Sequence, residues 1–114
     1  MGKKDLGPVH VLCICGTGVA GAAIVHETLR TLFAELKIPV QLETGASIQM
    51  EILFETSHVD MIVHTSILPR NFGVPSFLAI PLYTGIGEKE MLEGIRQAAK
   101  EIWAKRLQDA GEAQ

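Results

Sequence analysis

The sequence lacks several features that would each point to a particular class of protein. No apolar run reaches the length of a membrane span, and the ten Lys and Arg residues are scattered rather than gathered into the basic patch of a nucleic-acid-binding protein. Only two cysteines occur, Cys13 and Cys15, and no pair of cysteines or histidines has the spacing of zinc ligands. These absences argue against a membrane-spanning, a nucleic-acid-binding and a metal-binding protein.

The composition is that of one globular domain. The 114 residues are 47% hydrophobic and 20% charged, with a formal net charge of −3, which leaves enough apolar material for a real core. We interpret residues 1–114 as a single domain with flexible ends at 1–7 and 109–114. Because the two lysines near the start are not followed by the apolar segment of a secretory signal, we expect a cytoplasmic location.

Apolar patterns predict strands that alternate with helices. Strands are expected over 8–14, 40–43, 59–64 and 77–80, and helices over 21–36, 48–56 and 88–107. Ser47 is expected to cap the short second helix, with Ile48, Ile52 and Leu53 pointing inward. The alternation predicts right-handed crossovers and a mainly parallel sheet with helices on both faces, which is a three-layer α/β/α architecture.

Apolar stripes on two helices are expected to form much of the core. The stripe on the first helix consists of Ala22, Val25, Leu29, Leu32, Phe33 and Leu36. The stripe on the last helix consists of Met91, Leu92, Ile95, Ala99, Ile102 and Arg106. Cys13, inside the first strand, is interpreted as a small buried hydrophobic residue.

Cys15 lies where the first strand meets a glycine-rich loop, 16–21, that opens the first helix. Ligands of parallel α/β sheets bind beyond the carboxyl ends of the strands, so this is a favoured place for a site. Unpaired backbone N–H groups and the positive end of the helix dipole should lower the pKa of the thiol and attract phosphate. The sequence therefore predicts a cysteine that accepts a phosphoryl group.

The same glycines allow a second interpretation. Gly16, Gly18 and Gly21 match the dinucleotide-binding fingerprint, and Glu43 could bind the ribose. However, four strands are only about half of a full dinucleotide-binding unit, and no separate substrate domain follows. A small nucleotide-binding domain is therefore the alternative, and a regulatory module with an unreactive cysteine is a third hypothesis.

Phosphatase chemistry is disfavoured by the residue at position 21. In low-molecular-weight tyrosine phosphatases a similar cysteine opens a phosphate loop, and an arginine six positions later clamps the phosphate. That position is Gly21 here, so the bidentate stabilisation of phosphoryl transfer is missing. We expect a site that takes phosphate on sulfur without hydrolysing it quickly.

From about residue 9 to 102 the sequence resembles the IIB components of the sugar phosphotransferase system (PTS), specifically the galactitol-type branch. The resemblance is carried by the loop 15–20, the strand 59–63 with Thr65, the segment 70–73 and the segment 80–87. Each motif alone is weakly specific. Their order and spacing make the match fairly specific.

The resemblance implies a fold, an activity and partners. The fold is a four-stranded parallel sheet of order 2-1-3-4 with a P-loop after the first strand, as in low-molecular-weight tyrosine phosphatases. The protein would be a phosphotransferase of the EC 2.7.1 type without a cofactor. A IIA partner passes phosphate from a histidine to Cys15, which donates it to a sugar or polyol held by the membrane partner IIC, so the chain visits the inner face of the membrane. The implied phosphate-binding residues are Gly16, Thr17, Gly18, Val19, Ala20 and Gly21.

Several other residues are candidates for accessory roles. His64, Thr65 and Arg70 follow or end the third strand and could assist transfer, although an ordinary structural role is favoured for His64 and is equally open for Arg70. His10 is expected in the core, and His26 and His58 at the surface. The loop departs from the family pattern at positions 21–23, where Gly-Ala-Ala replaces residues that often include Thr and Ser. Hydroxyl support of the phosphate is then left to Thr17.

Overall fold

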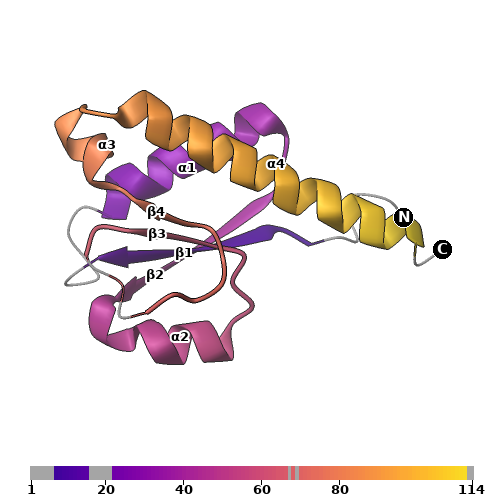
Figure 1. The fold of residues 1–114 in the computed structure, drawn as a ribbon, viewed down its shortest axis with the longest axis horizontal. Helices are drawn as coiled ribbons and strands as arrows, with labels where there is room; N and C mark the ends of the chain where they lie inside the picture. The colour runs from indigo at the N-terminus through magenta and orange to yellow at the C-terminus, as the bar shows by residue number, and fades with distance from the viewer. Residues whose placement is uncertain (1–6, 16–21, 67, 69, 113–114) are drawn as a thin grey trace.

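The computed structural model describes residues 7–15, 22–66, 68 and 70–112 (Figure 1). Its elements, in chain order, are β1 (Val9–Cys15), α1 (Ala22–Leu36), β2 (Val40–Ala46), the 3₁₀ turn η2 (Ser47–Gln49), α2 (Met50–Thr56), β3 (Met61–His64), β4 (Ser76–Leu78), α3 (Ile80–Thr84) and α4 (Glu88–Glu112). In this described part of the chain, no helix is both long enough and apolar enough to cross a membrane.

The four strands form one sheet in the order β2-β1-β3-β4, and every neighbouring pair is parallel. This confirms the predicted α/β class, the parallel sheet and the strand order. β1 lies between β2 and β3, where Cys15 pairs with Ala46 and Ile14 pairs with His64. Helices α1 and α4 cover one face and α2 covers the other (Figure 1).

The alternation of side chains along β1 divides the core into two clusters. Val11 and Cys13 pack in the cluster with α1 and α4, whereas Leu12 and Ile14 pack in the cluster with α2. Cys13 is only 1% exposed, so its predicted burial is confirmed. The α1 stripe is confirmed at four buried positions, Val25, Leu29, Leu32 and Phe33.

A glycine on β2 allows α2 to approach the sheet closely. A Cβ atom at Gly45 would lie 2.1 Å from Leu53 Cδ1, far inside the contact distance of two carbon atoms. Leu53 is partly buried and packs against the cluster that contains Leu12 and Ile14. The absent side chain of Gly45 therefore determines how α2 lies on this face.

The predicted inward face of the second helix is confirmed at Leu53, which is partly buried, but is wrong at Ile48 and Ile52. Ile48 is 93% exposed and Ile52 is 67% exposed, while Met50 is buried. The cause is the 3₁₀ turn η2, which has three residues per turn and shifts the phase of the α-helix that follows it. Ser47 is the first residue of that turn rather than the cap of α2.

The later elements also differ from the predicted bounds. The segment 80–84, predicted as the end of a strand followed by a loop, forms the short helix α3. Pro81 lies in its first turn, where its missing N–H needs no intrahelical partner, and Gly85 ends it at a φ of 79°. Helix α4 continues to Glu112 instead of ending near residue 107. Arg106, which lies within both the predicted and the observed bounds of this helix, reaches the amino end of the sheet.

Arg106 fixes the C-terminal half of α4 to the start of β1 and β3. Its guanidinium donates hydrogen bonds to the carbonyl oxygens of Gly7 (2.9 Å) and Pro8 (2.6 Å) and forms an ion pair of 2.5 Å with Asp60. The Asp60 carboxylate also accepts the backbone N–H of His10 (2.9 Å). One carboxylate therefore joins α4, β1 and the residue that precedes β3.

Candidate functional site

The strand order locates the expected ligand crevice. From β1 the chain crosses through α1 to β2 on one side, and from β2 it crosses through α2 to β3 on the other side of β1. The two crossovers leave the sheet in opposite directions, so the topological switch point lies beyond the carboxyl ends of β1 and β3. Cys15 is the last residue of β1 and therefore lies at this edge of the sheet. Its side chain and the predicted phosphate-binding residues 16–21 lie outside the described part of the structure.

Thr65 lies directly beside the end of β1. Its backbone N–H donates to the carbonyl oxygen of Ile14 at 2.9 Å, and its hydroxyl lies 3.5 Å from the same oxygen. Thr65, one of the candidate accessory residues, is thus held next to Ile14, the residue that precedes Cys15. Its assistance in transfer stays a prediction.

His64 ends β3 and makes a local hydrogen bond. Its Nδ1 lies 2.7 Å from the carbonyl oxygen of Ser66. A carbonyl oxygen only accepts, so Nδ1 carries the proton in this contact and the neutral ring has Nε2 as its acceptor. The imidazole therefore holds the backbone of the turn after β3.

A pair of serines at this edge was missed by the sequence analysis. Ser47 directly follows β2, Ser66 follows β3 by two positions, and their hydroxyl oxygens are 2.6 Å apart. Both side chains are partly exposed. The available signal was the presence of hydroxyl residues just after two strands, but their contact depends on the strand order.

The side chain of Arg70 contacts Glu51 and Phe72 rather than the ends of the strands. Its Nε and Nη2 donate to the carboxylate of Glu51 on α2, at 3.0 Å and 3.1 Å, and its guanidinium carbon lies 4.1 Å from the centroid of the Phe72 ring. These contacts tie the loop before β4 to α2. An accessory role for Arg70 in transfer stays a prediction.

His26 is partly buried, contrary to the surface position predicted for it. Its Nε2 lies 2.5 Å from the hydroxyl oxygen of Thr44, which is paired with Cys13 across β1 and β2. Burial, and next the positive charge of Arg30, lower the pKa of His26 below its ordinary value. The imidazole therefore joins α1 to β2 in its neutral form near pH 7.

The side chains of His10, His58 and Glu43 lie toward the opposite edge of the sheet, at the amino ends of the strands. Nε2 of His10, a mostly buried residue as predicted, lies 3.1 Å from the Glu43 carboxylate, and exposed His58 lies 3.0 Å from Asp60. Since His10 is the second residue of β1, this contact draws the Glu43 carboxylate toward the amino end of the sheet. That is the wrong direction for a ribose bound at the carboxyl ends.

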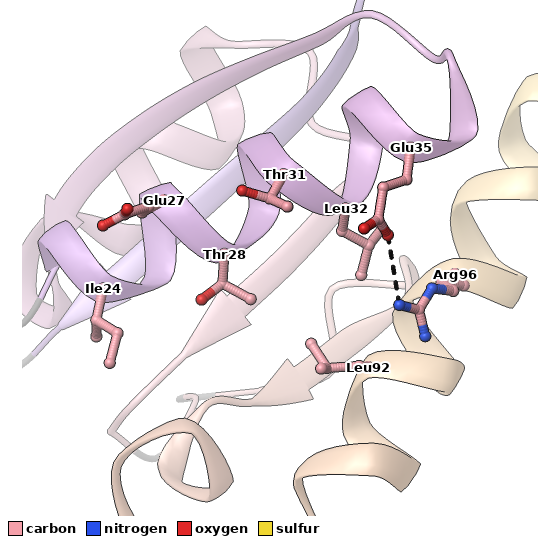
Figure 2. A pocket seen from close by; sticks show the side chains of 8 residues that line it. All are labelled: Ile24, Glu27, Thr28, Thr31, Leu32, Glu35, Leu92 and Arg96. Carbon is pink, nitrogen blue, oxygen red and sulfur yellow. Dashed lines mark ion pairs between the residues drawn. The ribbon is translucent and has the colours of Figure 1, made fainter.

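A groove of about 410 Å³ runs between α1 and α4 (Figure 2). Figure 2 shows Ile24, Thr28 and Thr31 along α1, with Leu92 on α4. The pair Arg96–Glu35, at 3.6 Å, joins the two helices at one end. The groove is lined by side chains of α1 and α4 rather than by residues at the strand ends.

The described residues contain no group of three or more His, Cys, Asp or Glu side chains that could hold a metal ion. No family model matches the chain, and no curated protein sequence matches it either. The fold and the edge just described define an α/β protein with a four-stranded parallel sheet and a cysteine at the end of a central strand. Its activity has to be inferred from these residues.

Proposed function

We propose that this protein is the phosphocarrier IIB component of a galactitol-type phosphotransferase system. Cys15 accepts a phosphoryl group from a phosphohistidine on a IIA partner and donates it to a sugar or polyol bound by the membrane partner IIC. One observation carries the proposal. Cys15 ends β1 at the switch point of a parallel sheet with the strand order 2-1-3-4.

The proposed cycle consists of two displacement reactions at phosphorus. In the first, the Cys15 thiolate attacks phosphorus, the S–P bond forms, and the P–N bond breaks with its electron pair returning to the histidine nitrogen. In the second, a substrate hydroxyl oxygen attacks, the O–P bond forms, and the S–P bond breaks to regenerate the thiolate. The hydroxyl proton leaves to solvent. No oxidant, reductant or cofactor takes part.

The start of α1 supports the thiolate form that this cycle needs. The helix begins at Ala22, and its first turn contains no acidic residue that would offset the positive end of the helix dipole. A thiolate or a phosphoryl group near this end is stabilised by the same field. Without an arginine at position 21, hydrolysis of phosphocysteine is not specially favoured, which suits a carrier.

The proposed partners imply where in the cell the protein acts. The chain acts in the cytoplasm and meets the inner face of the membrane through IIC. In this proposal the choice of sugar is made by IIC.

Intact-mass spectrometry tests the proposal. The protein is incubated with phosphoenolpyruvate, the general phosphotransferase proteins and a cognate IIA. One phosphoryl group is expected on the wild type and on Cys13→Ala, and none on Cys15→Ser. Cys13 is the matched control because it lies two positions earlier on the same strand and is buried.

Two results would contradict this function. A phosphoryl group that persists on Cys15→Ser would locate the acceptor elsewhere. Tight binding of a nicotinamide nucleotide, with no phosphorylation of the wild type, would favour the nucleotide-binding alternative.

A further inference from the structure

Strand β2 is the longer of the two edge strands of the sheet. It has seven residues and pairs with β1 on one side, whereas β4, at the other edge, has three residues. Its register with β1 runs without a bulge, and it contains neither a lysine nor a proline. Short length, bulges, lysines and prolines are the usual features that keep an edge strand from pairing with another chain. Strand β2 has none of these protections.

The hydrogen bonds beside β2 show which of its backbone groups face away from the sheet. The N–H of Val9 donates to the carbonyl oxygen of Pro39 at 2.9 Å, so the backbone of Pro39 faces β1. The backbone groups of successive strand residues point alternately to the two sides of the strand. Every second residue after Pro39 therefore also faces β1, and the N–H and C=O groups of Val40, Leu42 and Thr44 face outward.

This outer side is closed at its end and open in its middle. By the same alternation Ala46 faces outward, and its N–H donates to the side-chain oxygen of Gln49 at 2.9 Å. Among the described residues, the outward backbone groups of Val40, Leu42 and Thr44 meet no hydrogen-bond partner. Unpaired groups in a row are what a further strand binds.

We propose that β2 pairs with β2 of a second copy of this chain, antiparallel and about a two-fold axis at Leu42. In this register Leu42 lies opposite Leu42 of the second copy, and Val40 lies opposite Thr44 of the second copy. Outward residues then face outward residues, so each opposed pair exchanges both of its N–H···O bonds. The same surface serves both copies, as a two-fold interface requires, and it does not depend on the proposed function.

The intervening side chains favour this register. Gln41 lies opposite Glu43 of the second copy, in a non-hydrogen-bonded pair whose Cα atoms are about 4.5 Å apart. Gln41 is exposed and Glu43 is partly exposed, so the amide can donate to the carboxylate. By symmetry this contact occurs twice.

Two neighbouring registers are disfavoured. An axis at Glu43 would place two carboxylates directly opposite each other, and it would oppose Val40 to Ala46, whose N–H is already bound. An axis at Gln41 would oppose Thr44 to Ile38, whose N–H donates to the carbonyl oxygen of Phe33 at 3.0 Å.

The pairing also covers apolar surface at the edge. Val40 and Leu42 are only partly buried, against the cluster that α1 and α4 cover, and opposed side chains on one face of a sheet contact each other. One strand from each copy makes an interface smaller than the standard size, so we expect a reversible dimer with a Kd of about 100 µM. Since the two copies run antiparallel, their carboxyl edges lie at opposite ends of the joined sheet.

Sedimentation velocity between about 10 µM and about 1 mM protein tests the proposal, in about 0.15 M salt. The wild type should shift from monomer to dimer over this range. Gln41→Glu should raise the Kd about 5-fold, because it opposes two carboxylates in each symmetric pair, and Gln41→Lys should lower it about 5-fold. Gln108→Glu and Gln108→Lys are matched controls that make the same charge changes at an exposed position of α4, and they should leave the Kd unchanged.

Amide hydrogen exchange followed by NMR reports the backbone pairing directly. At a Kd of about 100 µM, the N–H groups of Val40, Leu42 and Thr44 should exchange about 3-fold more slowly in about 1 mM protein than in about 50 µM protein. The N–H groups of Gln41 and Glu43 already face β1, so their exchange should change little with concentration.

Three results would overturn the proposal. A wild type that stays monomeric at about 1 mM would leave this edge to an extended segment of a different protein. A dimer with unchanged exchange at the outward N–H groups would use another surface. A dimer that ignores both Gln41 variants but is strengthened by Glu43→Gln would have its axis at Glu43. None of these results bears on the carrier function, because that function is tested by the phosphoryl group on Cys15.

Discussion

The two edges of the sheet use polar residues in opposite ways. At the amino edge, charged groups are paired with one another: Asp60 binds Arg106 and His58, and Glu43 binds His10. At the carboxyl edge, the groups that follow β2 and β3 are neutral hydroxyls, those of Ser47, Thr65 and Ser66. The first edge is cross-linked by charge, and the second carries neutral hydroxyls.

This difference shows that a cluster of polar residues is not by itself a site. An anion that approached Arg106 would have to displace Asp60, whose side chain is 12% exposed, and leave a nearly buried carboxylate without its partner. Ser47 and Ser66, by contrast, are neutral, so their contact contains no charge that an anion would leave unpaired. The amino edge is therefore suited to holding α4 in place.

The largest effect on stability is expected from Asp60→Asn. The change keeps the shape of the side chain but leaves Arg106, 19% exposed, without its carboxylate, so the free energy of unfolding should fall by about 2 kcal/mol. Urea unfolding followed by the fluorescence of Trp103, the single tryptophan, measures this. The affinity for inorganic phosphate should not change.

Glu93→Gln is the matched control for that prediction. It breaks another ion pair of α4, between Glu93 and Arg96, but the Glu93 side chain is 59% exposed. A loss below about 0.5 kcal/mol is expected because exposed pairs contribute little. Equal losses for the two variants would mean that the amino edge is not a cross-link.

A smaller effect is expected from Gly45→Ala, near the carboxyl end of β2. The added Cβ meets the end of the Leu53 side chain at 2.1 Å, and moving that flexible side chain should cost about 1 kcal/mol. Thermal or urea unfolding of Gly45→Ala, Leu53→Ala and the double variant checks the cause. Since Leu53→Ala removes the clashing atom, the double variant should be more stable than the sum of the two single losses predicts. Strict additivity would show that the contact is not the source.

The smallest effect concerns His26 and pH. Its pKa is lowered in the folded protein, first by burial and then by Arg30, so it takes up a proton at a lower pH than in the unfolded chain. Below about pH 6.5 the unfolded state therefore binds more protons, and the free energy of unfolding falls as the pH is lowered through the folded pKa. His26→Gln should lose less stability than the wild type between about pH 7.5 and about pH 5.5.

Thr44→Val separates the causes of this pH dependence. It removes the hydrogen-bonding hydroxyl but keeps the buried imidazole and Arg30, so the slope of stability with pH should stay close to that of the wild type. A slope lost in Thr44→Val and kept in His26→Gln would be the reverse of this expectation.

Much of the fold could be predicted because it depends on local patterns. The apolar run of β1 and the helical period of α1 are properties of neighbouring residues, and the alternation of strands and helices leads to a parallel sheet. The errors occur where a local signal was ambiguous. A 3₁₀ turn at Ser47–Gln49 changed the buried face of α2, and Pro81 ended no strand but began α3. Pro81 could have been interpreted as a first-turn proline, whereas nothing in the sequence marks the 3₁₀ turn.

The candidate site could be predicted only in part, because some of its contacts do not follow from local sequence patterns. Cys15 could be located from its place between a strand and a glycine loop. The Ser47–Ser66 contact spans 19 positions, and the Thr44–His26 contact spans 18. Neither pair has a spacing that a local rule would recognise, since each depends on which strands and helices become neighbours.

The sequence by itself determined that Cys15 would end a strand, that Cys13 would be buried and that the sheet would be parallel, because apolar periodicity and glycine loops act over a few residues. Only the tertiary structure decided that Asp60 would form an ion pair with Arg106. It also decided that Ser47 and Ser66, which follow separate strands, would be in contact near the end of β1. The physical reason is the strand order. Placing β1 between β2 and β3 brings residues together that are far apart along the chain.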